Sequence, residues 1–185
     1  MASEIHYFQR YSQRENVATN NTLLLFSRLY NESIHKFNVF INELLGEESI
    51  DVGIKFSQQS KSLSSVPDGV MEQSSFKVVI ETKLVSGKNF SKKQLLNHFT
   101  SFKNEEKKIL IALSPTKMGE KLFKEISDEC NLKEYSINFI NITFRDIVKA
   151  FNTSINDYDF QLKEIIDDYQ SYCFSEKLIN DEEFR

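Results

Sequence analysis

The chain has 185 residues, and its 23 Lys and Arg against 27 Asp and Glu give a formal net charge of −4. This balance excludes a uniformly basic protein that coats nucleic acid. A hydrophobic fraction of 40%, with 16 Phe and 7 Tyr, is enough for one packed core and excludes a disordered chain.

Apolar residues that recur at spacings of three and four predict two helices near the start of the chain, over 13–30 and 33–45. Ser33 offers a side-chain acceptor where the second helix begins, and Gly46 offers a C-terminal stop. Three strands are predicted to follow, over 51–58, 66–73 and 75–85.

The second half of the chain alternates predicted helices and strands. Ser91 begins a helix that carries Leu95 and Phe99 on one side, and the short apolar run 109–113 suits a strand covered on both faces. The predicted fold class is therefore α/β, with a mixed central sheet and helices on both faces. The remaining predicted elements are a helix at 117–130, a strand at 136–144 and helices at 145–151 and 158–174.

Charge is distributed unevenly, since residues 1–76 carry −3, residues 77–124 carry +7 and residues 125–185 carry −8. A nucleic-acid enzyme needs cations near its site, because each neutralised phosphate strengthens binding through counterion release. We predict that lysines of the middle segment contact the phosphate backbone, and an ordinary solvated surface is the alternative interpretation. The predicted contacts are Lys88, Lys92 and Lys93. The acidic last third is expected to be a solvated or partner-facing surface.

Two short polar motifs carry the chemistry, Pro67-Asp68-Gly69 and Glu81-Thr82-Lys83. Side chains alternate along a strand, so Glu81 and Lys83 project to one side, while the other side carries the apolar residues Phe76, Val78, Ile80 and Leu84. If the strand of Asp68 pairs with this one, two carboxylates and one ammonium group converge. Each motif also has an ordinary interpretation, because Pro-Asp-Gly is a turn signature and Glu-x-Lys is common on solvated strand faces.

Two carboxylates about 4 Å apart repel by roughly 4 kcal/mol at an effective dielectric near 20, and a divalent cation removes that repulsion. Oxygen ligands without His or Cys favour Mg²⁺, with Mn²⁺ as a substitute. Lys83 would then lie where negative charge accumulates, and it could stabilise a phosphate transition state or help position and deprotonate the attacking water.

This arrangement resembles the PD-(D/E)XK nuclease superfamily, whose restriction-endonuclease-like αβββαβ core matches the order of elements predicted from 13 to 113. The resemblance implies that Asp68 and Glu81 bind the metal, that the Thr82 carbonyl completes the coordination, and that Lys83 assists the reaction. It also implies that Gln94 is a fourth catalytic residue, which organises the site, and that Glu15 is an additional metal ligand.

The last two residues have a rival interpretation as helix caps. Glu15 ends a Ser-x-x-Glu pattern that begins at Ser12, and Gln94 ends a Ser-x-x-Gln pattern that begins at Ser91, both typical of a capping box. His98 follows Gln94 in a Gln-x-x-x-His arrangement that is similar to the Gln-x-x-x-Tyr motif of RecB-type members. We expect His98 to be a partly exposed helix residue.

The sequence thus predicts a magnesium-dependent nuclease that hydrolyses phosphodiester bonds, an endodeoxyribonuclease of a bacterial or phage defence, restriction or repair type by association with the superfamily. A non-catalytic nucleic-acid-binding or assembly module, with Glu81 and Lys83 as a plain ion pair, and an RNA-directed nuclease are the alternatives. The expected partner is DNA. The chain is also expected either to form a homodimer or to be joined to an additional C-terminal domain.

Domain organisation and compartment complete the expectations. We divide the chain into a nuclease-like core domain over 1–150 and a C-terminal helical extension over 151–185, which would lead into a further domain if the protein is longer. Cys130 and Cys173 lie 43 positions apart without a ligand-like spacing, which argues against a disulfide framework or a zinc site. No apolar run approaches the roughly 20 residues of a membrane helix, so a reducing cytoplasmic setting is expected.

Overall fold

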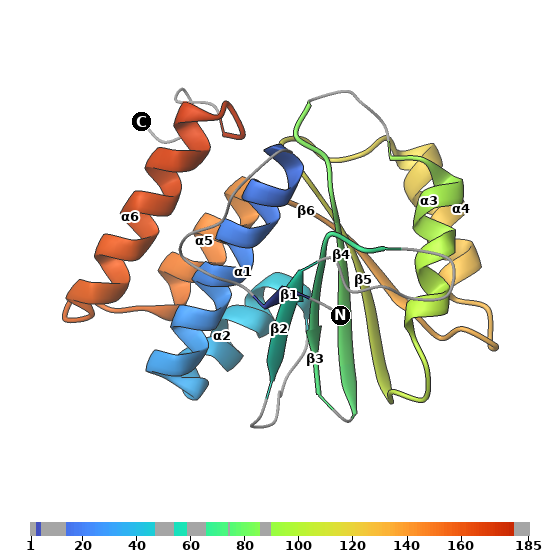
Figure 1. Ribbon diagram of the computed structural model, residues 1–185, viewed down its shortest axis with the longest axis horizontal. Coiled ribbons are helices and arrows are strands. Elements are labelled where there is room, and N and C mark those ends of the chain that lie inside the picture. The colour runs from blue at the N-terminus through green and yellow to red at the C-terminus, as the bar shows by residue number, and fades with distance from the viewer. Residues whose placement is uncertain are drawn as a thin grey trace.

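The structure is a computed structural model, and it describes residues 3–4, 14–46, 54–58, 66–73, 75–85 and 90–179. Within these residues six strands form one sheet in the order β1 to β6, and helices cover both of its faces (Figure 1). The predicted α/β class, with a mixed sheet between helices, is confirmed. The strands are β1 (Ser3–Glu4), β2 (Lys55–Gln58), β3 (Gly69–Glu72), β4 (Phe76–Thr82), β5 (Lys107–Ser114) and β6 (Asn138–Thr143).

The sheet changes from antiparallel to parallel pairing at β4. The successive pairs from β1 to β4 are antiparallel, whereas β5 runs parallel to β4 and β6 runs parallel to β5. The carboxyl ends of three strands therefore meet at one end of the sheet, at Thr82, Ser114 and Thr143, which we call the carboxyl edge. Because β3 is antiparallel to β4, the start of β3 lies at this edge as well.

Four helices lie on one side of the sheet, α1 (Arg14–Glu32), α2 (Ile34–Leu45), α5 (Phe144–Ser154) and α6 (Phe160–Ser175), and α6 packs on the outside of α1 and α5 (Figure 1). They bury a core rich in phenylalanine, in which the rings of Phe26 and Phe40 lie 4.9 Å apart and Phe40 also packs against Phe151. Residues Phe76, Val78 and Ile80 of β4 face this core. The predicted alternation along the strand is thus confirmed on its apolar side.

The opposite face carries α3 (Lys92–Asn97), a 3₁₀ turn η1 (His98–Ser101) and α4 (Glu120–Cys130). Val79 of β4 belongs to the second core on this side, together with Leu95 of α3 and Ile126 of α4. All seven residues of β4 are buried. The face to which Glu81 points is therefore a covered face and not a solvated one, which removes the ordinary interpretation of the Glu-x-Lys pattern at Glu81.

The element ends agree with the sequence pattern where local signals mark them. Ser33 caps α2 by accepting a hydrogen bond from the Lys36 N–H, and Gly46 ends it with a left-handed backbone, φ 71°. The strand predicted from residue 51 is observed from Lys55, and residues 51–53 lie outside the described part of the chain. The helix predicted from 117 begins at Glu120.

The helical extension packs on the same core as the rest of the chain. Leu162 and Ile166 of α6 lie in the core that α1 and α5 share, and the Tyr169 hydroxyl is hydrogen bonded to that of Thr22 over 2.7 Å. The predicted boundary after residue 150 falls inside α5. None of the described helices is long and apolar enough to cross a membrane.

Helix α1 approaches the start of β3 closely because residue 69 has no side chain. A Cβ atom on Gly69 would lie 2.9 Å from the Thr19 Cγ2 and 3.1 Å from the Leu23 Cδ1, both on α1. Contacts that short are repulsive, so glycine is needed at this position for the helix to reach the strand. The close approach brings the start of α1 to the carboxyl edge, beside Asp68.

Candidate active site

The two halves of the predicted motif meet at the carboxyl edge. Asp68 directly precedes β3, and Glu81 and Thr82 are the last two residues of β4. Gly69 pairs with Ile80, so the strands place Asp68 beside Glu81. The Thr82 N–H donates a hydrogen bond to the Asp68 Oδ2 over 2.8 Å. The pairing of the two motif strands, on which the convergence depends, is thus confirmed.

Glu81 is a buried carboxylate with three side-chain donors. Its side chain is 2% exposed. Oε1 accepts from the Lys83 Nζ over 3.1 Å and from the Gln94 amide, and Oε2 is joined to the His98 Nε2 over 2.9 Å. A buried charge is tolerated only when it is paired and hydrogen bonded, and these donors meet that requirement.

Asp68 has a strongly shifted pKa. Burial, followed by the negative charge of Glu81, raises the pKa of this carboxyl from 3.8 to about 7, although the Thr82 N–H and the Lys83 ammonium oppose the shift. This carboxyl therefore holds its proton to a higher pH than an ordinary Asp does. A cation placed between the two carboxylates would relieve the repulsion and bring the pKa down.

Lys83 is held as an ammonium group. Burial lowers its pKa, but the charge and hydrogen bond of Glu81 and the charges of Glu15 and Asp68 outweigh burial and raise the pKa above the ordinary value. Its Nζ lies 3.6 Å from the Glu15 Oε2. In this arrangement Lys83 can supply positive charge and hydrogen-bond donors. To accept a proton from water, it would first have to lose the negative charges of the surrounding carboxylates, which raise its pKa.

The start of α1 is hydrogen bonded to the end of β4. A hydrogen bond over 2.8 Å joins the hydroxyl groups of Thr19 and Thr82, and both residues are fully buried. This contact brings Glu15, one turn before Thr19, to Lys83. The capping partner suggested for Glu15, Ser12, lies outside the described residues. A role of Glu15 as a metal ligand stays a prediction.

Gln94 and His98 reach Glu81 from the helix that covers this face. The Ser91 hydroxyl caps α3 by accepting a hydrogen bond from the Gln94 N–H, while the Gln94 side-chain amide donates to the Glu81 Oε1. The expectation that His98 is partly exposed is wrong, because its side chain is 2% exposed. The spacing of four between the two residues, on a helix facing a charged strand position, was the available signal.

The predicted phosphate contacts differ in their surroundings. Lys92 forms an ion pair with Glu129 of α4, with the Lys92 Nζ 3.2 Å from the Glu129 Oε1. Lys93 is exposed at the start of α3, next to Gln94. Lys88 lies outside the described residues. A contact between these lysines and phosphate groups stays a prediction.

The side chains at the carboxyl edge could supply only some of the oxygen ligands that a divalent cation such as Mg²⁺ needs. In the described part of the chain, no group of three or more His, Cys, Asp or Glu side chains is arranged to hold a metal ion. Asp68 and Glu81 supply two carboxylates, and magnesium characteristically takes one or two carboxylates and fills its other positions with water and substrate oxygens. The residues present are therefore compatible with Mg²⁺, whose other coordination positions would be taken by water and phosphate oxygens.

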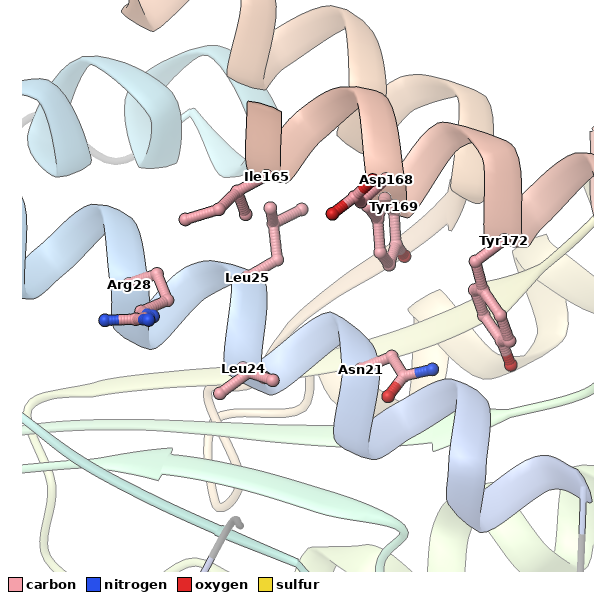
Figure 2. Close-up of a pocket in the computed structure, with 8 residues that line it drawn as sticks. All are labelled: Asn21, Leu24, Leu25, Arg28, Ile165, Asp168, Tyr169 and Tyr172. Atoms are coloured by element: carbon pink, nitrogen blue, oxygen red, sulfur yellow. The ribbon is translucent and has the colours of Figure 1, made fainter. Parts of the chain in front are cut away.

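A separate hollow of about 270 Å³ lies between α1 and α6. Figure 2 shows it bordered by Leu24 and Leu25 on one helix and by Ile165, Tyr169 and Tyr172 on the other. None of the residues gathered around Glu81 lines this hollow. The cluster of carboxylates, ammonium group and imidazole at the carboxyl edge is therefore separate from this hollow.

Comparisons with known proteins assign no family: no family model matches the chain, and neither the curated proteins nor the solved structures include a significant match.

Proposed function

We propose that the protein is a magnesium-dependent nuclease that hydrolyses phosphodiester bonds in DNA, cutting within the strand. The observation that carries the proposal is the meeting of Asp68, Glu81 and Lys83 at the carboxyl edge, with the pKa of Asp68 raised to about 7. A strongly shifted carboxyl beside a second carboxylate is costly for stability, and such arrangements are concentrated at functional sites. The resemblance of the motif to the PD-(D/E)XK superfamily supports the same function.

Each side chain has a definable part in this reaction. Asp68 and Glu81 would hold the cation, with the Thr82 carbonyl as a further oxygen donor. The bound cation supplies a Lewis acid that polarises the phosphoryl group and lowers the pKa of the attacking water. The Lys83 ammonium group stabilises negative charge that develops on the phosphate oxygens. Gln94 donates to the Glu81 Oε1 and orients the carboxylate before the cation binds.

Charge supports a nucleic-acid substrate, and the sequence pattern supports DNA over RNA. The segment 77–124 carries +7 and includes the exposed Lys93, next to the site residue Gln94. Backbone phosphates attract such a segment without any reading of bases. The sequence contains no aromatic RNA-recognition motif that would favour RNA.

The direct test is cleavage of labelled DNA and RNA substrates, circular and linear, in Mg²⁺, in Mn²⁺ and in chelator. We expect cutting of circular DNA that chelator abolishes. K83A should lower the rate at least about 100-fold, because it removes an electrostatic contact to the transition state. K149A, which changes an exposed lysine of α5, is the matched control and should cut normally. Unchanged turnover in folded K83A would contradict the proposal.

A second candidate is a non-catalytic binding or assembly module. The contact of 3.1 Å between the Lys83 Nζ and the Glu81 Oε1 favours it, since this ion pair can serve stability alone. The two candidates differ in metal binding. Calorimetric titration with Mn²⁺ should show a saturable site in the wild type that D68N removes, whereas a binding module should show no such site.

A further inference from the structure

The two oxygens of Glu81 have different partners. Oε1 is on the side of the carboxylate that meets Lys83, and it also accepts from the Gln94 amide. Oε2 is joined to the His98 Nε2 at 2.9 Å, and both side chains are 2% exposed. Oε1 is therefore bonded to Lys83, which follows β4, and to Gln94 of α3, whereas Oε2 is bonded to the turn η1.

The chemistry of the pair fixes the direction of the His98 hydrogen bond. A carboxylate that binds a cation is ionised and has no proton to give, so in the proposed metal site the His98 Nε2 must carry the proton. This holds for the neutral and for the protonated imidazole alike. His98 therefore acts on Glu81 as a donor, and the imidazole ring, enclosed in η1 beneath the sheet, has little freedom to leave it.

The two contacts to Oε1 come from side chains that have more freedom to move. Lys83 has a flexible four-carbon stem, and Gln94 can turn about its side-chain bonds. Oε1 can thus exchange its partners for a cation, while Oε2 keeps its bond to a rigid ring. Such an arrangement orients a ligand through a buried partner that does not itself touch the cation.

We propose that His98 is a positioning residue that holds Glu81 through Oε2 and so leaves Oε1 aimed at the divalent cation. This inference rests on the proposed function, since it assigns His98 a part in the same site. It predicts that the removal of the His98 donor weakens metal binding even when the protein stays folded. Buried partners of metal ligands typically contribute about 10- to 100-fold to metal affinity.

The test uses Mn²⁺ as the probe and calorimetric titration of the metal-free protein as the readout, so it does not depend on cleavage. H98Q places an amide nitrogen near the position of Nε2 and should keep the donor, whereas H98N can place one only near Nδ1. H98L fills much of the space without a donor. H35L, which changes an exposed histidine of α2, is the matched control.

We expect the dissociation constant for Mn²⁺ to rise about 10- to 100-fold in H98L and H98N, to stay within about threefold in H98Q, and not to change in H35L. Unfolding temperatures without metal show which variants are folded, and if H98L is unfolded the comparison of H98Q with H98N decides. Equal affinity in all folded His98 variants, or equal weakening in H98Q and H98N, would overturn the inference. Wild-type protein that binds no Mn²⁺ would overturn the proposed function instead, before any variant is made.

Discussion

Thr19 of α1 and Thr82 of β4 are joined by a hydrogen bond between their hydroxyl groups, over 2.8 Å and with both residues fully buried. The pair lies where the first helix meets the motif strand. It links the helix that carries Glu15 to the strand that carries Glu81, and it anchors α1 one turn after Glu15.

T19V should therefore destabilise the protein, because it removes a buried hydrogen bond while nearly preserving shape. We expect a loss of about 1–2 kcal/mol in the free energy of unfolding, measured in urea. T153V changes an exposed threonine of α5 and should cost less than about 0.5 kcal/mol. A double-mutant cycle with T82V should show a coupling energy, and strict additivity would contradict a direct bond.

G69A should be more harmful than an ordinary glycine substitution. The new methyl group would lie 2.9 Å from the Thr19 Cγ2 and force α1 away from the sheet. We expect a loss of about 1–3 kcal/mol in unfolding free energy, together with a fall in activity as α1 shifts. G119A is the control, since no atom lies within 4 Å of a Cβ placed there. Equal stability of the two variants would show that α1 does not press on β3.

The raised pKa of Asp68 predicts a pH-dependent penalty in metal-free protein. Between about pH 4 and 7 the folded protein holds a proton that the unfolded chain has released, so this group's contribution to stability falls as pH rises through that window. D68N removes the penalty. Without metal it should be more stable than the wild type at pH 8 by about 1–3 kcal/mol, and the difference should shrink at pH 4.

Unfolding in urea at both pH values, with chelator present, measures this difference. Saturating Mg²⁺ should reverse the order at pH 8, because only the wild type gains free energy from binding the cation. A wild-type protein that is more stable than D68N at pH 8 without metal would contradict a carboxyl destabilised by burial and by Glu81.

Lys93 should contribute to DNA binding more than Lys92 does. Lys92 is paired with Glu129, whereas Lys93 is exposed at the start of α3. K93A should lower the slope of log affinity against log salt concentration by about 0.9, the value for one phosphate contact, and K92A by less. Fluorescence anisotropy with a DNA duplex, in the presence of chelator, measures the salt dependence of binding for both variants. An unchanged slope in K93A would show that Lys93 does not contact a phosphate.

The sequence was sufficient to predict the fold class, because the signals that define it are local. The apolar run 109–113 indicated a strand covered on both faces, and β5 is buried there between the two cores. Ser33 and Gly46 marked the ends of α2 through their own side-chain and backbone preferences. Such features depend on neighbouring residues and not on the rest of the chain.

The site was predictable in part. Strand alternation was enough to place Glu81 and Lys83 on the same side of the strand. Bringing Asp68 to them required the assumption that its strand pairs with β4, and the register confirms that pairing. His98 was misjudged because its burial depends on how α3 tightens into η1 and packs over β4, which a helical pattern does not specify. The contact between Thr19 and Thr82 was missed for the same reason: two threonines 63 residues apart carry no local signal.

The position of β4 has a consequence for the timescales within the site. β4 is flanked by β3 and β5 and buried along its whole length, so the backbone amides of Glu81 and Thr82 should exchange with solvent only when the whole protein unfolds. Glu15 comes from the first turn of α1, where helices fray. We therefore expect Glu81 to stay in place for as long as the fold does, and Glu15 to leave and return with the first turn of α1. A ligand that recruits Glu15 would slow hydrogen exchange in the first turn of α1 and leave that of β4 unchanged.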